Sequence, residues 1–326
     1  MCTLQVYHER WPLKNPFTIS RGSKIHADVV VVRLFQNDIS GHGECTPYAR
    51  YGESVAGVVE QIEKIAPLLS QGITRSQLLQ ILPAGAARNA VDCALWDLEC
   101  KRSKQHIWEK LNIKAPVCVP TAYTLSLDTP EQMRKEAVQH ANRKLLKLKL
   151  GHEGDIERVS AVRDGAPRAQ LIVDANEAWD SATYVRLVPE LQALGVTMIE
   201  QPFPSDQDDA LATLPRPIPI CADESCHESS GLAHLVNRYD MINIKLDKTG
   251  GLTEALHMQT QAREHGLKIM VGCMVSTSLS MAPAMVLAQY SDIVDLDGPL
   301  LLQSDRSEGL LYRDSHVWPS QPALWG

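Results

Sequence analysis

The sequence lacks the features that mark three broad classes of protein. It has no run of lysine and arginine of the kind that binds nucleic-acid phosphates, and its formal net charge is −7. No apolar run approaches the roughly 20 residues that a helix needs to cross a bilayer. The first residues show no basic segment followed by an apolar one, as a secretion signal would. We therefore expect a cytoplasmic protein that binds neither nucleic acid nor a membrane.

The cysteines also lack a pattern. The eight cysteines are scattered, and none forms a CxxC motif or a Cys/His cluster with the spacing of a zinc site. Most of them lie in apolar runs, which is typical of reduced, buried thiols in a cytosolic protein. We expect free thiols and no zinc centre.

What the chain does have is length and two different patterns. Its 326 residues suffice for a barrel of about 250 residues and a smaller unit of roughly 100. The first part, residues 1–115, predicts an α+β domain in which Gly41 and Gly43 mark a turn before a short third strand. The polar segment 15–26 predicts a mobile loop between the first two strands. The expected strands and helices of this part cover residues 4–13, 27–35, 54–70, 75–82 and 86–103.

From residue 116 to 298, short apolar strands alternate with helical segments. One helix opens with Asp128-Thr129-Pro130, a capping residue followed by proline in the first turn. Eight such units predict parallel strands in a closed barrel; an open doubly wound sheet is the rival, but no glycine-rich phosphate turn follows the first strand. The expected strands are 117–123, 145–150, 170–174, 197–200, 218–223, 241–246, 268–272 and 293–297. The tail, residues 299–326, is expected to pack back on the first domain.

The second expected strand carries two lysines in alternation with leucines. Side chains alternate across a strand, so the leucines share one face and Lys147 and Lys149 share the other. The leucines must pack under the helices, which directs both lysines into the barrel near its top. Buried ammonium groups are costly, and these two therefore require partners or a function.

Ionisable residues recur at the ends of the next strands. Asp174, Glu200, Asp223 and Lys245 each follow the previous one by about one strand–helix unit. They therefore collect at the rim where barrel enzymes keep their active sites. Alone, each has an ordinary explanation, because strand lysines are usually solvated and aspartates often cap helices. Their recurrence around one rim favours a functional site over these separate explanations.

Three carboxylates with no thiol or imidazole form a hard-oxygen site that suits Mg²⁺, with Mn²⁺ as an alternative. The cation would relieve the repulsion among the carboxylates. A metal between two lysines can act on a carbon acid, because it stabilises the enediolate formed when a proton leaves the carbon beside a carboxylate. A neighbouring ammonium such as Lys147 and a dication would lower the pKa of Lys149 and make it available as a base.

These motifs resemble the enolase superfamily, in its muconate-lactonizing-enzyme-like branch. The resemblance covers nearly the whole chain, including Gly43-Glu44 and the segment 94–98. The motifs that carry it are Lys147-Leu-Lys149, Asp174-Ala-Asn176, Glu200-Gln-Pro202, Ala222-Asp223-Glu224-Ser225 and Asn243-Ile-Lys245. It implies a modified TIM-type (β/α)7β barrel, α/β in class, closed over by an α+β capping domain. This superfamily pairs a lysine or histidine base with Mg²⁺.

The resemblance also implies roles. Asp174, Glu200 and Asp223 would bind the metal, and Lys149 and Lys245 would be bases on opposite faces of the substrate carbon, with Asn176 and Glu224 supporting them. Bases on both faces invert the carbon by 1,1-proton transfer.

Asp295 and Asp297 resemble the D-x-D motif with which dipeptide epimerases hold an α-ammonium. Thr124 matches a position near the substrate backbone, and the cations Arg21 and Lys24 would suit an acidic side chain. The implied reaction converts L-Ala-D-Glu to L-Ala-L-Glu, with dipeptides from peptidoglycan as the substrate class.

Three other functions remain open at this point. A lyase or cycloisomerase of the succinylbenzoate-synthase type needs the same metal and lysines, but not Asp295 and Asp297. A sugar-acid dehydratase usually needs a histidine base after strand six or seven, but strand seven here reads Val271-Gly272-Cys273-Met274 and contains none. A non-catalytic binding barrel would have no need of both lysines and all three carboxylates. Barrels with caps often associate, so a homo-oligomer is possible.

Overall fold

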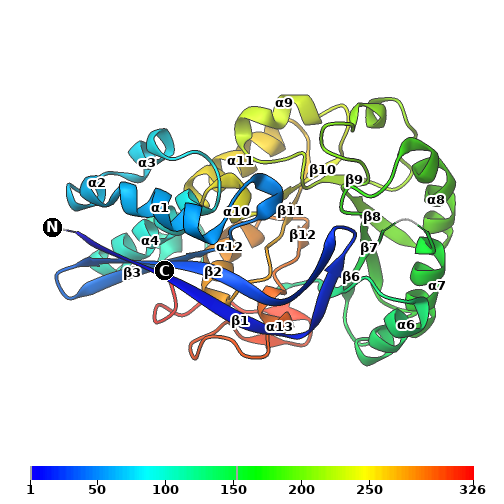
Figure 1. Cartoon of the computed structure of the whole chain (residues 1–326), viewed down its shortest axis with the longest axis horizontal. Helices are drawn as coiled ribbons and strands as arrows, with labels where there is room; N and C mark the ends of the chain where they lie inside the picture. The colour runs from blue at the N-terminus through cyan, green and yellow to red at the C-terminus, as the bar shows by residue number, and fades with distance from the viewer. Residues whose placement is uncertain (1, 152) are drawn as a thin grey trace.

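The computed structural model describes residues 2–151 and 153–326, arranged as a capping part and a barrel. In Figure 1 the capping part, coloured blue to cyan, lies beside the barrel, and a long hairpin reaches from it across the barrel strands. No helix among the described residues combines the length and apolarity needed to cross a membrane.

The hairpin is formed by β1 (Thr3–Ile19) and β2 (Gly22–Gln36). The predicted loop over 15–26 is wrong, because the antiparallel pairing resumes at Phe17 opposite Lys24 after a register shift and continues to Ile19 opposite Gly22. The small polar residues therefore form the end of a hairpin. A backbone hydrogen bond from Leu127 to Thr18 ties this end to the barrel.

The third capping strand, β3 (Ile39–Cys45), contains the glycines that were expected to form a turn. That expectation is wrong for a packing reason. A Cβ at Gly41 would lie 2.3 Å from the Ala94 carbonyl oxygen, and one at Gly43 would lie 2.0 Å from the Ala90 carbonyl oxygen. Glycine therefore allows the strand to lie directly against helix α4.

The predicted capping helices are present. The segment expected at 54–70 is two helices, and a further short helix follows α4. These helices are α1 (Val55–Lys64), α2 (Ala66–Ser70), α3 (Arg75–Ile81), α4 (Ala86–Ser103) and α5 (Ile107–Lys110). Apolar residues of α1, α2, α3 and α4 share one core with the inner face of the β1–β3 sheet.

The barrel strands run in parallel and in sequence order, which confirms the barrel. They are β5 (Tyr123–Leu125), β6 (Leu145–Lys149), β7 (Gln170–Asp174), β8 (Val196–Glu200), β9 (Ile220–Ala222), β10 (Met241–Ile244), β11 (Lys268–Val271) and β12 (Ile293–Val294). A hydrogen bond from the Ala122 N–H to the Val294 carbonyl, 2.9 Å long, joins the last strand to the first.

Helices cover the outside of this barrel. Thr129 caps α6 through its side chain, as the sequence predicts. The principal connecting helices are α6 (Pro130–Gln139), α7 (Asp155–Gly165), α8 (Ser181–Ala193), α9 (Leu232–Leu235), α10 (Leu246–Thr249), α11 (Leu252–Glu264) and α12 (Ser278–Ala288), and α13 (Gly298–Leu301) follows the last strand.

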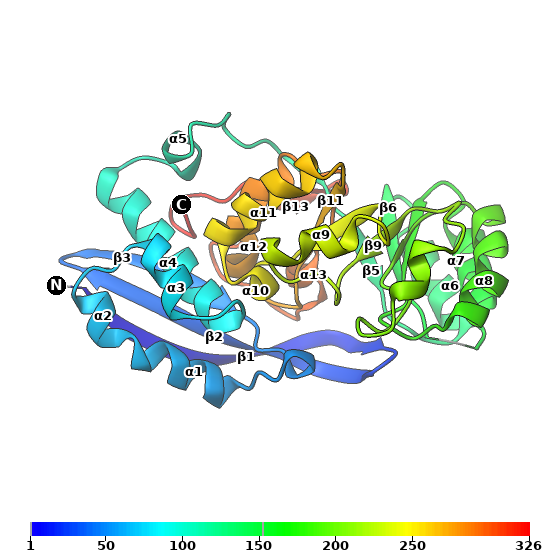
Figure 2. The same cartoon turned by 90° about the horizontal axis from the view of Figure 1, so that it is seen from above.

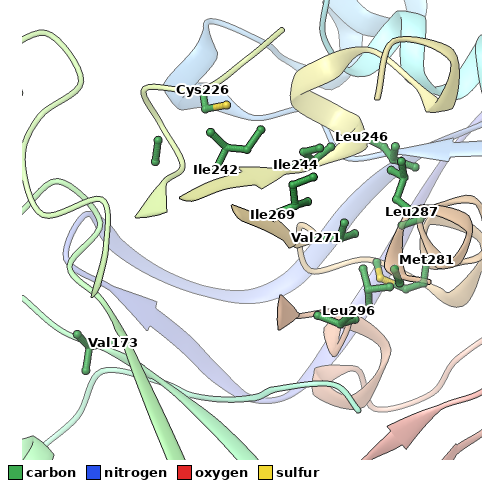
Figure 3. Close-up of a cluster of buried hydrophobic side chains, with 14 of the residues drawn as sticks. Val173, Cys226, Ile242, Ile244, Leu246, Ile269, Val271, Met281, Leu287 and Leu296 are labelled. Carbon is green, nitrogen blue, oxygen red and sulfur yellow. The ribbon is translucent and has the colours of Figure 1, made fainter. Parts of the chain in front are cut away.

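The two faces of the barrel strands differ in composition. Leu146 and Leu148 of β6 belong to the large outer core under the helices, as predicted. Figure 3 shows the side chains of Ile244, Val271 and Leu287 within this core. Inward residues at the bottom form a second apolar layer, which contains Leu145, Ile172, Met198, Cys221, Met241 and Met270. Each of the first four lies on the inward face of a strand that places an ionisable residue higher up. The lower part of the barrel interior is therefore filled by apolar side chains, and the upper part carries the ionisable ones.

The first predicted barrel strand was placed too early. Its first half is β4 (Val119–Pro120), which pairs with the tail strand β14 (His316–Val317), itself paired with β13 (Tyr312–Arg313). The tail also reaches the capping part, where the Trp325 indole donates to the Cys93 carbonyl at 2.9 Å. Figure 2 shows the C-terminus lying near α4. The boundaries at 115 and 298 stay a prediction.

Candidate active site

Three carboxylates converge at the top of the barrel. Asp174 ends β7, Glu200 ends β8 and Asp223 follows β9, and one oxygen from each lies within 4.8 Å of the others. All three residues are buried. Hard oxygen donors from three strands fit a small divalent cation such as Mg²⁺, which accepts carboxylates and completes its shell with water or substrate.

Three buried lysines surround these carboxylates. Lys147 Nζ lies 2.6 Å from Glu200 Oε2 and 2.8 Å from Asp295 Oδ2. Lys149, in β6, has its Nζ 2.6 Å from Asp174 Oδ2. Lys245, directly after β10, has its Nζ 2.6 Å from Asp223 Oδ2. Because the strand order is β10-β9-β8-β7-β6, the two lysines flank the strands that carry the three carboxylates. The lysines of the sequence prediction therefore lie in one cluster with the predicted metal ligands.

The electrostatics of the cluster keep it charged. Burial opposes the ammonium of Lys245, but Asp223 and Glu200 raise its pKa well above the ordinary value. Burial likewise opposes the carboxylate of Asp174, yet Lys149 and Lys147 lower its pKa to about 2. Burial and the nearby Asp174 raise the pKa of Glu200. Paired charges thus offset the cost of desolvation.

The two aspartates of the D-x-D motif lie beside the cluster. Asp295 contacts Lys147 through one oxygen, and its Oδ1 is buried with no hydrogen-bond partner among the described residues. Asp297 Oδ2 accepts a 2.6 Å hydrogen bond from the backbone N–H of Thr124 in β5. Burial and the neighbouring Asp295 raise the pKa of Asp297 to about 7. This corner therefore holds a carboxylate oxygen that a cationic group can satisfy.

The end of the hairpin lies over the site. Arg21 donates to Glu224 Oε1 at 2.7 Å and to the Asn176 carbonyl at 2.8 Å. Its Nη2 also reaches the Tyr48 hydroxyl, so several of its donors already have protein partners. Lys24 Nζ lies 5.3 Å from the centre of the Tyr48 ring, and the side chain is exposed. The structure brings Arg21 to the site and leaves Lys24 facing solvent at its edge.

Sequence reasoning missed Lys248, whose side chain is fully buried 2.6 Å from Asp223 Oδ1. The signal was present, because Lys248 stands three residues after Lys245 and so one helical turn beyond the strand end. Asn243 was noted only as part of the motif Asn243-Ile-Lys245, with no role of its own. Its side-chain amide donates to Glu200 Oε1 at 2.8 Å.

Two family patterns cover most of the chain. Residues 1–111 match the mandelate racemase / muconate lactonizing enzyme N-terminal domain, and residues 131–322 match the enolase C-terminal domain-like family. An L-Ala-D/L-Glu epimerase of Escherichia coli (strain K12) is 49% identical over 314 residues, which cover 96% of this chain and 98% of that protein. An N-acetyl-D-glutamate racemase of Pseudoalteromonas sp is 44% identical over 302 residues, covering 91% and 95%.

Solved structures agree with this relationship. An enolase family member from Agrobacterium tumefaciens with homology to dipeptide epimerases, with bound sodium and L-Ala-L-Glu, has a TM-score of 0.99 and 49% identity over all of both chains. A dipeptide epimerase from Enterococcus faecalis V583, complexed with Mg and L-Leu-L-Tyr, has a TM-score of 0.90 at 28% identity and covers 98% of this chain and 97% of its own.

Proposed function

Because the chain belongs to the enolase superfamily, in its mandelate racemase and muconate lactonizing enzyme group, we propose that it is a Mg²⁺-dependent dipeptide epimerase of Ala-Glu. The observation that carries this proposal is the carboxylate group flanked by Lys149 on one side and Lys245 on the other, each 2.6 Å from a different carboxylate. A substrate carbon held between the two amines can lose a proton on one face and regain one on the other.

Different residues of the site bind the metal, transfer the proton and supply a fixed charge. Asp174, Glu200 and Asp223 would hold Mg²⁺, which when bound would stabilise the negative charge that develops on the substrate carboxylate. One of Lys149 and Lys245 takes the α-proton in its neutral form, and the other, as an ammonium, donates a proton to the opposite face. Lys147, between Glu200 and Asp295, supplies a fixed positive charge beside the reacting group.

Substrate recognition follows from the charges around this centre. Asp295 and Asp297 bind the α-ammonium of the dipeptide, and Thr124 orients Asp297 through its backbone N–H. Lys24 attracts the glutamate side chain, while Arg21 holds the hairpin end against Glu224. Ala-Glu units derived from peptidoglycan carry these groups, and we place the reaction in the cytoplasm.

A second candidate is racemisation of an N-acylated glutamate, as in the Pseudoalteromonas relative. One observation favours it: Asp295 already contacts Lys147, and Asp297 already accepts from Thr124. Both aspartates therefore have a protein partner, which lowers the cost of a neutral acyl amide in place of an ammonium. The lyase alternative has no observation of this kind in its favour, since it leaves the unpaired Asp295 Oδ1 without a role.

Proton NMR in D₂O tests the proposal. L-Ala-L-Glu with enzyme and Mg²⁺ should lose its Glu α-proton signal while L-Ala-D-Glu appears, and a chelator should stop both changes. N-acetyl-L-glutamate in the same assay separates the second candidate. Turnover of the N-acetyl compound alone would replace the dipeptide proposal, and silence with both and with a wider dipeptide panel would remove it.

A further inference from the structure

The third carboxylate of the cluster, Asp223, is held by groups that cannot reach a substrate. Lys248 Nζ lies 2.5 Å from the Asp223 carbonyl oxygen, 2.6 Å from its Oδ1 and 3.0 Å from the Asn243 carbonyl oxygen. An ammonium has three N–H donors, and these three contacts use all of them. The side chain of Lys248 is 0% exposed, so it has no route to solvent or to a dipeptide.

Gln201 holds the same residue from the other side. Its Oε1 accepts hydrogen bonds from the backbone N–H groups of Asp223, at 2.9 Å, and of Ser225, at 3.1 Å. Its amide nitrogen donates to the Tyr239 hydroxyl at 3.0 Å and to the Ser225 hydroxyl at 2.8 Å. Both hydroxyls donate to the buried Asp208 at 2.6 Å. A chain of buried hydrogen bonds therefore orients the Gln201 amide.

Gln201 occupies a backbone conformation that side-chain-bearing residues rarely adopt. Its φ is 33°, in the left-handed region, although it directly follows Glu200 at the end of β8. Such a conformation persists only when its surroundings enforce it. Here the result is that the side chain following one carboxylate of the cluster reaches the backbone of another.

We propose that Lys248 and Gln201 are positioning residues that clamp Asp223 so that its Oδ2, and not its Oδ1, is presented to the metal. The clamp fixes the residue at its backbone N–H, its carbonyl oxygen and its Oδ1, and Oδ2 is the oxygen that faces Lys245 at 2.6 Å. The inference rests on the proposed function only in naming Asp223 a metal ligand. Its effect is on how one carboxylate is presented, and neither residue touches the substrate.

Titration with Mn²⁺, followed by the EPR signal of the free ion, tests the clamp without any substrate. Lys248→Met removes all three contacts and should weaken Mn²⁺ binding about ten- to a hundredfold, the usual effect of losing a group that orients a ligand. Loss of positive charge alone would tighten binding. Tighter or unchanged binding in a folded variant would therefore overturn the proposal. Lys248→Arg, which keeps the charge in a different shape, should recover only part of the affinity.

A matched control is Lys101→Met. Lys101 also donates to a buried aspartate, Asp97, at 2.7 Å, but within α4 of the capping part. The Lys101→Met variant should bind Mn²⁺ as tightly as the wild type. This control distinguishes an effect of the clamp from a general effect of losing a Lys–Asp pair. Circular dichroism and thermal unfolding show whether each variant folds.

If Lys248→Met fails to fold, the same titration is carried out on Tyr239→Phe. It removes a single hydroxyl from the chain that orients Gln201 and should weaken Mn²⁺ binding to a smaller, measurable extent; unchanged affinity would contradict the clamp. The NMR assay then separates the two proposals. If the wild type binds Mn²⁺ but epimerises nothing, the proposed function is wrong and the clamp still holds. If the wild type epimerises the dipeptide and the variants bind Mn²⁺ as tightly as it does, the clamp is wrong and the proposed function still holds.

Discussion

Arg21 at the end of the capping hairpin donates a 2.7 Å hydrogen bond to Glu224, the residue that follows the carboxylate Asp223. The contact joins two parts of the chain 203 positions apart. Glu224 is almost fully buried, and burial together with Asp223 raises its pKa to about 7. The hairpin is thus tied directly to the residue beside the proposed metal site, in addition to its backbone hydrogen bond from Leu127.

The first prediction concerns this tie. Arg21→Met should raise KM for L-Ala-L-Glu by about tenfold, because a charge-assisted hydrogen bond contributes on the order of 1.5–3 kcal/mol and less where it is partly exposed. Mg²⁺ affinity should stay near the wild-type value. Arg10→Met, which removes a cation that pairs with Asp28 on the same hairpin, is the control and should leave KM unchanged. Equal KM values for Arg21→Met and wild type would show that the tie does not position the hairpin for binding.

Lys24 is expected to select the acidic side chain. Lys24→Met should raise KM for L-Ala-L-Glu by roughly three- to tenfold, in line with one solvent-screened charge pair. The KM for a neutral dipeptide such as L-Ala-L-Leu should hardly change. Steady-state kinetics on the two substrates measures the difference, and an equal rise with both would mean that Lys24 supports the hairpin and does not recognise glutamate.

Asp297→Asn should separate the two candidate substrates. The amide keeps an oxygen for the Thr124 N–H but removes the charge that would pair with the α-ammonium. Turnover of L-Ala-L-Glu should fall by about a hundredfold, corresponding to roughly 3 kcal/mol for a buried charged hydrogen bond. Any activity with N-acetyl-L-glutamate should survive. An equal loss with both substrates would indicate that Asp297 organises the site and does not bind the ammonium.

Stability should depend on pH through Asp92 in α4. Burial raises its pKa to about 6 in spite of hydrogen bonds from Thr253, whose N–H and hydroxyl both donate to it. Because the folded pKa lies above the unfolded value of about 4, this group's contribution is greatest below pH 4 and is lost as the pH rises through 6. The loss is at most about 3 kcal/mol.

Asp92→Asn should remove that part of the pH dependence. Urea unfolding at several pH values gives the free energy of unfolding of each protein. The wild-type value minus the variant value should fall between pH 4 and 7. Asp180→Asn should show the opposite trend at low pH, because the Thr183 N–H lowers the pKa of this exposed helix cap. A difference for Asp92→Asn that is flat across the range would contradict the assignment.

Local patterns predicted much of the arrangement. Alternation in Leu146-Lys147-Leu148-Lys149 was enough to direct two lysines inward, since a strand under helices has only one apolar face. Regular spacing was enough to predict that Asp174, Glu200 and Asp223 lie together, because parallel strands of one barrel end at one rim.

Contacts between distant segments could not be predicted in the same way. The segment 15–26 looks like a loop in composition, but antiparallel pairing and a hydrogen bond to Leu127 make it a hairpin. Gly41 and Gly43 resemble turn residues until α4 is placed against them. The first half of the run 117–123 pairs with a tail strand almost 200 residues later. Lys248 stands on a short helix whose direction depends on the strand before it.

α-Proton exchange in D₂O shows whether Lys149 and Lys245 act on opposite faces of one carbon. Lys149→Met and Lys245→Met would each be given L-Ala-L-Glu and L-Ala-D-Glu separately, with Mg²⁺, and followed by proton NMR. We predict that neither variant interconverts the epimers. We further predict that each still exchanges the α-proton of one epimer, and that the epimer differs between the two variants. Exchange of the same epimer by both variants, or continued epimerisation by either, would contradict the account.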